Sequence, residues 1–141
     1  MRRALKPGGR LGIACWADLS QCGFFADLVE SLRHCGLDDI AALMEVPWSF
    51  PDAKKLADLL RAAGFSDLRI ETRSLGMVFE GGIDQLFAAV TTATPVASLL
   101  PAAPEKQRNA FERAFRKRAA AHRRGDSLEA HMVSNLAIAL R

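Results

Sequence analysis

The pattern of hydrophobic and polar residues contains stretches that are typical of strands. Residues 10–16 are almost continuously apolar, which predicts a strand covered on both faces, as in a parallel sheet. Residues 68–73 alternate between apolar and polar, which predicts a half-exposed strand, and residues 77–79 continue in extended form up to a glycine pair. Residues 131–140 follow a turn sequence and are rich in apolar side chains, so we interpret them as a final strand.

Other segments repeat their apolar residues every three or four positions, which predicts amphipathic helices. The clearest is residues 52–63, which has Pro51 at its start and Gly64 at its end. The remaining predicted helices cover residues 21–35, 83–92 and 105–123, with a shorter one at 37–44. Three segments are less regular: residues 1–5, typical of the last turn of a helix, an irregular link at 46–51 and a connection at 94–104.

The order of these elements is β-α-(α)-α-β-(β)-α-α-β, which predicts an α/β fold. The chain has 141 residues, of which 50% are hydrophobic and 25% charged, so it is long enough to bury a substantial core. It contains no internal repeat and no linker long enough to separate two domains, and we expect residues 1–141 to form a single unit. Because residues 1–5 end a helix that has no start signal before it, we expect the chain to begin inside an element.

Hydrophobic length and cysteine usage predict a cytoplasmic protein without a membrane segment. No apolar run approaches the roughly 20 residues that span a bilayer, and no apolar stretch follows the two arginines near the N-terminus. The three cysteines, Cys15, Cys22 and Cys35, form neither a C-x-x-C pair nor an even set, which favours free thiols in a reducing compartment. We expect them to be core thiols, with a reactive thiol as the alternative.

Positive charge is concentrated in one predicted helix. Residues 104–124 hold eight basic and two acidic residues, whereas the whole chain has a net charge of only +3. The same helix carries Phe111 and Phe115 one turn apart, so a helix packed through its aromatic side chains with a solvated basic face is the simpler interpretation. An anionic partner is the alternative, although no aromatic residue is interleaved among the bases to stack on nucleic acid.

Motifs that carry chemistry by themselves are absent from the sequence. The three histidines, His34, His122 and His131, are not at metal-ligand spacing on one element, so we expect no metal site. The sequence has no G-x-S-x-G elbow, phosphate-binding loop or G-x-G-x-x-G turn, and the two glycine pairs are explained as turns. No catalytic residue can therefore be assigned from a motif.

Position along the fold nevertheless suggests where a ligand would bind. Ligands of open α/β sheets bind beyond the carboxyl ends of the strands, and the first predicted strand ends at Trp16. The candidate pocket residues are Cys15, Trp16, Asp18 and Ser20 together with Trp48 in the irregular link. For the two tryptophans, an ordinary place in the core or at its rim is an equally good interpretation.

Two motifs in order carry a resemblance to a known family. Residues 5–11, Leu-Lys-Pro-Gly-Gly-Arg-Leu, lead into an apolar strand, and residues 59–65, Leu-Leu-Arg-Ala-Ala-Gly-Phe, lead into the strand at 68–73. Together they resemble the C-terminal half of class I S-adenosylmethionine-dependent methyltransferases, especially the small-molecule group that includes ubiquinone/menaquinone-biosynthesis-like enzymes. The resemblance covers essentially the whole chain.

The resemblance implies a partial Rossmann-like sheet. In the family the strand order is 3-2-1-4-5-7-6 with strand 7 antiparallel, so residues 10–16 correspond to strand 5, 68–73 to strand 6, and 131–140 to strand 7 between them. Residues 83–123 correspond to a helical insertion that covers the substrate. The function so implied is the substrate-side portion of a methyltransferase that acts on a small-molecule methyl acceptor.

The resemblance also implies what this chain lacks. The glycine-rich loop and the acidic residue that hold S-adenosylmethionine have no counterpart here and would precede Met1. We therefore expect the cofactor to bind the complete family fold and not this chain alone, which would be inactive by itself. Strand 10–16 would also lack its neighbour, strand 4, and we expect a homo-oligomer that pairs through this exposed edge. A non-catalytic binding or dimerisation module is the alternative, and nucleic-acid binding a weaker one.

Overall fold

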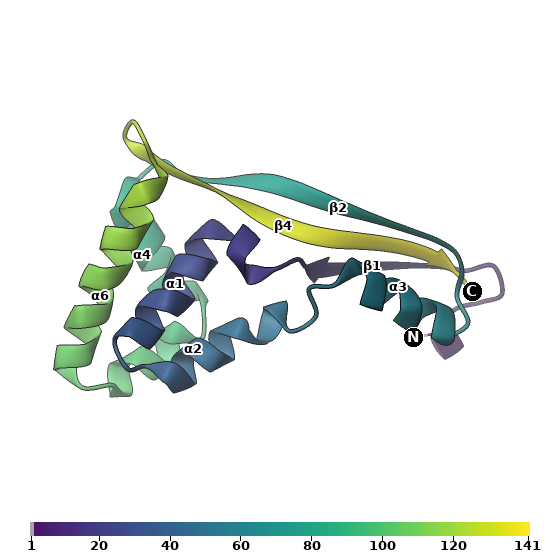
Figure 1. The fold of residues 1–141 in the computed structure, drawn as a ribbon, viewed down its shortest axis with the longest axis horizontal. Coiled ribbons are helices and arrows are strands. Elements are labelled where there is room, and N and C mark those ends of the chain that lie inside the picture. Colours follow the sequence, from purple (N-terminus) through teal and green to yellow (C-terminus); the bar gives the residue numbers. More distant parts are fainter. Residues whose placement is uncertain (1) are drawn as a thin grey trace.

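The structure of the protein is a computed structural model that describes residues 2–141. It is elongated, with a group of helices at one end and a sheet that extends away from them (Figure 1). Within the described residues the fold is mixed α/β, with six α-helices and a four-stranded antiparallel open sheet. The helices are α1 (Gly23–His34), α2 (Asp38–Glu45), α3 (Ala53–Ala62), α4 (Gly82–Ala93), α5 (Val96–Leu99) and α6 (Glu105–Ala119), and the strands are β1 (Arg10–Trp16), β2 (Ser66–Phe79), β3 (Arg123–Arg124) and β4 (Ser127–Leu140).

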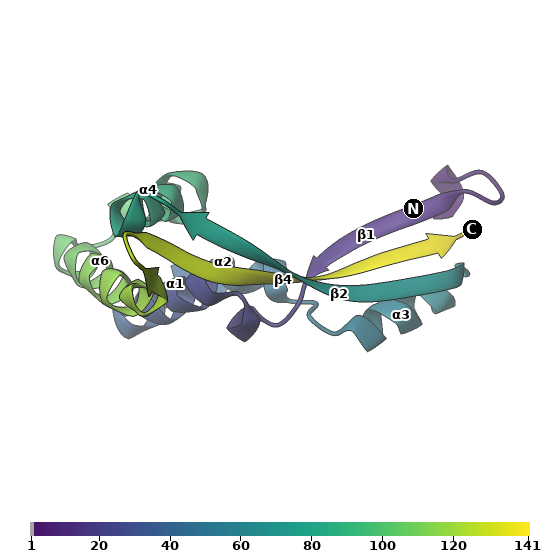
Figure 2. The ribbon, with the colours of Figure 1, turned by 90° about the horizontal axis from the view of Figure 1, so that it is seen from above.

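The last strand of the chain lies in the middle of the sheet. The order is β1-β4-β2, and β4 is antiparallel to both neighbours, so β1 and β2 run parallel to each other (Figure 2). The predicted order of the three strands and the antiparallel middle strand are thus confirmed. Because β4 has 14 residues and β1 only seven, the first half of β4 pairs with β2 and the short β3 but not with β1.

The two halves of β4 bury opposite faces. Ala137 and Ala139 pack against α3, whereas Leu128 and Ala130 pack against the helices at the far end. Successive side chains of a strand point to opposite sides, and these two pairs differ in parity, so they lie on opposite faces of the strand. One strand therefore links two separate cores.

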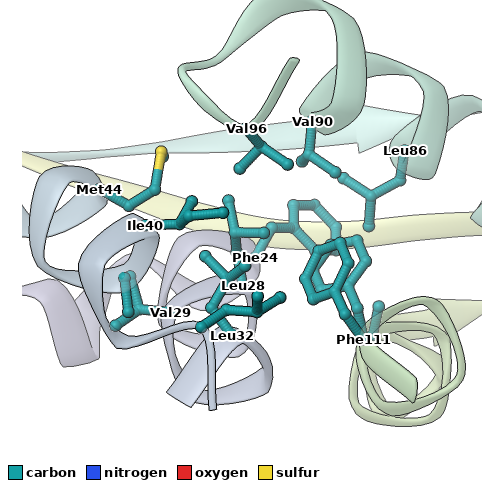
Figure 3. Close-up of a cluster of buried hydrophobic side chains, with 14 of the residues drawn as sticks. Phe24, Leu28, Val29, Leu32, Ile40, Met44, Leu86, Val90, Val96 and Phe111 are labelled. Atoms are coloured by element: carbon teal, nitrogen blue, oxygen red, sulfur yellow. The ribbon is translucent and has the colours of Figure 1, made fainter. Parts of the chain in front are cut away.

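The larger core lies among α1, α4 and α6 (Figure 3). Phe111 and Phe115 are fully buried there and stack with their ring centroids 6.0 Å apart. Burying a phenylalanine contributes about 2 kcal/mol, so this pair accounts for much of the attachment of α6. The predicted packing of the basic helix through its aromatic side chains is thus confirmed. The other fully buried large residues of this core are Phe24, Leu28, Leu32, Leu86 and Leu128.

The smaller core lies between α3 and one face of the sheet. Leu56 and Leu60, at the helical spacing seen in the sequence, pack there with Phe65. The opposite face of this part of the sheet is open: Leu136 is 42% exposed and Ile138 56%. The prediction that residues 10–16 are covered on both faces is therefore wrong for residues 2–141, because α3 covers one face and no described element covers the other.

Several predicted boundaries also need correction. The segments 68–73 and 77–79 are parts of one strand, β2, and the final strand begins at Ser127, four residues before the predicted start. The predicted connection 94–104 contains α5 and a 3-10 turn, Leu100–Ala102. Helix α6 ends at Ala119 and a 3-10 turn continues to His122. Of the predicted turn at 1–5, Met1 lies outside the described residues and Arg2–Ala4 form a 3-10 turn.

Asn135 of β4 connects three parts of the fold. Its side chain is buried, with only 3% of the residue exposed. The Thr72 hydroxyl of β2 donates a hydrogen bond to Asn135 Oδ1 at 2.8 Å, and Asn135 Nδ2 donates to the Pro51 carbonyl, just before α3, at 2.8 Å. Cys15 of β1 lies opposite Asn135 in the ladder. The residue thus fixes β4 against β2 and α3 at the place where all three strands meet.

We predict that Asn135→Ala lowers the free energy of unfolding by about 2–3 kcal/mol, because it removes two hydrogen bonds and leaves the Pro51 carbonyl without its donor. Thr72→Val, which removes only one bond at the more exposed end, is the control and should cost about 1 kcal/mol. Urea unfolding followed by circular dichroism measures both. Equal midpoints for the two variants would show that the bond to Pro51 contributes nothing.

Candidate functional site

The chain turns sharply after β1, and Asp18 holds the turn. Its carboxylate accepts hydrogen bonds from the Ser20 backbone N–H at 2.9 Å and from the Ser20 hydroxyl at 2.6 Å, capping the 3-10 turn Leu19–Gln21. The hydrogen bond from the Ser20 side chain, and then that from its backbone, lowers the pKa of the Asp18 carboxyl. The structure thus brings Asp18 and Ser20 together, in a role that shapes the exit from β1.

The two predicted tryptophans also lie together. Trp16 and Trp48 stack with their ring centroids 5.8 Å apart, and Phe25 lies against Trp48 at 5.0 Å. The Trp48 Nε1–H donates to the Cys22 sulfur at 3.3 Å, and both residues are buried with Met132. Trp48 is therefore mainly a core residue, while the half-buried Trp16 lies at the rim of the same cluster.

Cys15 is separated from the other four predicted residues. It is half-buried and packs with Leu11 and Ile13 in the core under α3. Three of the remaining residues, Asp18, Ser20 and Trp48, face two different depressions. Asp18 and Trp48 line one of about 350 Å³ with Glu45, whereas Ser20 lines another of about 340 Å³.

The depression beside Ser20 is the richer in chemistry. It lies where the turn after β1, the last residues of β2, the start of β4 and the segment that follows α6 meet. Methionine, valine, alanine and glycine form its apolar wall. Its polar lining residues are Ser20, Gln21, His122, Arg124, Glu129 and His131.

Two histidines of this depression have side-chain partners. The His122 Nε2 atom lies 2.8 Å from Asp27 Oδ2 of α1, and the His131 Nδ1 atom lies 3.3 Å from the Ser74 hydroxyl of β2. Burial raises the pKa of the Asp27 carboxyl, while the hydrogen bond with His122 acts in the opposite direction. Sequence reasoning did not find this pair, because its members are 95 positions apart and neither stands in a motif.

The basic face of α6 is partly neutralised. Arg116 bonds Glu112 at 2.8 Å and Asp84 at 2.6 Å, and Arg118 bonds Glu30 at 2.5 Å. The Arg116 guanidinium also lies 4.8 Å from the centre of the Phe87 ring, where a cation is attracted to the aromatic face. These contacts tie the basic residues to the neighbouring helices and favour the solvated-face interpretation over an anionic partner.

Thiols, metal ligands and membrane segments give no further site within residues 2–141. The three cysteines are free, Cys22 buried and the other two half-buried, and burial raises the pKa of the Cys35 thiol. The described side chains contain no group of three or more histidine, cysteine or acidic residues that could hold a metal ion. No single described helix is both long and apolar enough to cross a membrane, although the bent pair Gly82–Ala93 and Val96–Ala102 meets the length and composition together.

The chain matches no protein-family model and no curated protein. A functional assignment therefore rests on the strand order, on the open side of the sheet and on the side chains around the depression beside Ser20. The depression itself lies just beyond the carboxyl end of β1.

We predict that Asp18→Ala lowers the melting temperature at about pH 7 by about 2–3 °C, since losing an exposed cap costs about 0.5 kcal/mol. A carboxyl with a lowered pKa stabilises the fold above its ordinary pKa of 3.8, and this contribution is lost as the pH falls through the lowered value. The difference between wild type and variant should therefore shrink towards about pH 3.

Asp18→Asn is the matched control, because asparagine caps nearly as well and does not titrate. Its melting temperature at about pH 7 should be close to that of wild type and higher than that of Asp18→Ala. A difference between wild type and Asp18→Ala that is the same at both pH values would show that the charge of Asp18 does not support the turn.

Proposed function

We propose that this chain is the C-terminal, substrate-side portion of an S-adenosylmethionine-dependent methyltransferase with a Rossmann-like sheet. The observation that supports it is the position of β4, antiparallel between the parallel strands β1 and β2. This is the arrangement that the resemblance implies for strands 5, 7 and 6. All pairings among the described strands are antiparallel, so this part of the sheet agrees with the family order without being peculiar to it.

Two further features agree with this proposal. The outer edge of β1 has no neighbouring strand among residues 2–141, and strand 4 of the family would lie there. Residues 82–122 are mostly helical and end beside the depression that Ser20 lines, in keeping with a segment that covers a substrate. The small-molecule methyl acceptor would occupy this depression.

The glycine-rich loop of the family follows its strand 1, whereas β1 of this chain would correspond to strand 5, so the proposal places no cofactor cradle in this chain. The turn after β1 is instead held by the Asp18 carboxylate. The residues of this chain would thus bind and orient the methyl acceptor, and orientation contributes a large part of the rate in such a transfer.

A second candidate is a non-catalytic binding or dimerisation module, and the edge of β1 favours it. The Arg141 N–H donates to the Gly9 carbonyl and the Ala17 N–H donates to the Val133 carbonyl, so the odd-numbered residues of β1 direct their backbone groups towards β4. The even-numbered residues between them, Gly12 and Ala14 among them, then present their N–H and C=O groups at the free edge. Such an edge can pair with another strand, including that of a second copy.

We predict that the purified chain alone does not bind S-adenosylmethionine at micromolar concentration in isothermal titration calorimetry. The decisive step is to translate the DNA upstream of the Met1 codon and search it for three or four strand-helix units of roughly 30 residues each that include a glycine-rich loop. Co-expression of that segment with this chain should restore binding.

Binding of S-adenosylmethionine by this chain alone would contradict the proposal that another segment of the fold holds the cofactor. A co-expressed complex that forms but binds no cofactor would overturn the methyltransferase proposal. If the upstream DNA encodes no strand-helix units with a glycine-rich loop, the interpretation as a non-catalytic binding or dimerisation module replaces the methyltransferase proposal.

We predict that the chain forms a dimer or larger oligomer through β1 and that Ala14→Lys shifts it to the monomer. Ala14 is exposed on the open face of the sheet, so a lysine there should not disturb the fold of a single copy. Its charge should, however, disfavour pairing between the β1 edges of two copies. Ala62→Lys, which adds the same charge at the exposed end of α3, is the control. Light scattering at high concentration should give the monomer mass only for Ala14→Lys, and a monomeric wild type would refute this interface.

A further inference from the structure

One face of the sheet has no cover at the end where α3 lies. Helix α3 packs on the other face, and no described element lies over this one (Figure 1). We call this surface the open face; it is formed by residues 10, 12 and 14 of β1, residues 136, 138 and 140 of β4, and residues 69, 71 and 73 of β2. Ile138 lies in the central strand and is nevertheless 56% exposed. Exposed apolar surface of this kind marks an interaction site.

The register of the sheet gives the open face a trough along β1. Gly12 lies opposite Ile138 and Ala14 lies opposite Leu136, whereas the long side chain of Arg69 lies beside Ile138 on the β2 side. A Cβ at Gly12 would meet no atom within 4 Å, and the backbone of Gly12 is not in the left-handed region. Neither the backbone nor a described neighbour therefore requires a glycine here, whereas close approach of another molecule does.

The open face also carries positive charge that the fold does not neutralise. Arg10 and Arg69 line a depression of about 490 Å³, and neither forms an ion pair with another of residues 2–141. The nearby acid Glu71 is already paired with Arg73. Asp67, at the end of the depression, is not within ion-pair distance of either arginine. Two guanidinium groups are thus available to an acidic partner.

The geometry of a sheet face selects a helix as the occupant. The N–H and C=O groups of the sheet lie in its plane, so a molecule on the face must satisfy its own backbone groups. A helix does this internally, whereas a single extended segment would leave its groups unpaired. The apolar strip from Leu136 to Leu140 is about 14 Å long at about 3.4 Å per residue, which matches about nine residues of a helix.

Charge argues against a second copy of this chain as the occupant. Two open faces stacked on each other would bring Arg10 and Arg69 of both copies into one interface, where like charges oppose association. Pairing through the edges of β1, in contrast, would join two sheets side by side and leave both open faces uncovered.

We propose that the open face binds an amphipathic helix of a partner polypeptide, with small and aliphatic side chains over Gly12 and Ile138 and acidic side chains against Arg10 and Arg69. The apolar stripe of the helix covers Leu136 and Ile138 from water. A carboxylate binds a guanidinium in a defined geometry, so the arginines set the orientation of the helix. This docking surface needs neither a cofactor nor a methyl acceptor, and it goes beyond the proposed function.

The probe for the test is a synthetic amphipathic peptide of about 18 residues, long enough to form an isolated helix, with leucine and alanine on one stripe and glutamate on its flanks. A second peptide has lysine at every glutamate position. Fluorescence anisotropy of the labelled peptides with the full chain should show about tenfold tighter binding of the acidic peptide, and this preference should decrease as the salt concentration rises.

Arg69→Glu should weaken binding of the acidic peptide about fivefold, because it replaces an attraction by a repulsion of similar size. Lys55→Glu makes the same change of charge on the exposed surface of α3 and is the matched control, which should bind like wild type. Ile138→Ser removes an exposed apolar side chain and should weaken the binding of both peptides. Circular dichroism establishes that each variant is folded.

NMR of the isotope-labelled chain locates the peptide. The methyl signals of Leu136 and Ile138 should shift when the acidic peptide is added, and the signals around Ser20 should not. Absence of binding, equal binding of the two peptides, equal effects of Arg69→Glu and Lys55→Glu, or shifts away from the open face would each overturn the proposal. Shifts of the same methyl signals with protein concentration alone would identify a second copy as the occupant and would also overturn it. A negative cofactor experiment leaves these readouts unchanged, so the two proposals can fail separately.

Discussion

The fold depends on a single constraint, the insertion of β4 between β1 and β2. Among residues 2–141 only β4 pairs with both β1 and β2, through its second half, and without it these two strands would have no common partner. Asn135 holds this arrangement at its centre, because its amide is bonded to Thr72 on one side and to the Pro51 carbonyl before α3. A buried amide with both ends bonded fixes register more strictly than an alanine would, since a slip of one residue would leave it unsatisfied.

The same strand explains why the molecule has two cores. Leu128 and Ala130 face the helices, whereas Ala137 and Ala139 face α3 on the opposite side of β4. Neither core wraps around the sheet, so Leu136 and Ile138 remain exposed and the outer edge of β1 stays unpaired in this chain. The open face and the free edge adjoin each other, and both are the features that an additional strand, from another segment or a second copy, would cover.

The junction between the two cores is also where the chemistry gathers. Four segments distant in the sequence meet beside Ser20, and they bring His122, Arg124, Glu129 and His131 around one depression. The site that we expected at the end of the first strand is thus adjacent to a group of polar residues, although three of the five expected residues serve mainly structure. Asp18 caps a turn, Trp48 fills a core and Cys15 lies under α3. The methyltransferase proposal concerns this junction.

The sequence by itself determined the elements whose burial follows a period. The helix at 53–62 and the aromatic packing of α6 were predictable because their leucines and phenylalanines recur on one face, and the strand order followed from the resemblance. Residues 74–76 of β2, between the predicted segments 68–73 and 77–79, were not predicted, because their side chains are exposed and one of them is a glycine, so only pairing with β4 makes them part of a strand. The tertiary structure alone decided the contact of His122 with Asp27 and the stacking of Trp16 on Trp48. The physical reason is that periodicity reports which face of an element is buried, whereas a polar contact across 95 residues depends on how separate elements are placed in space.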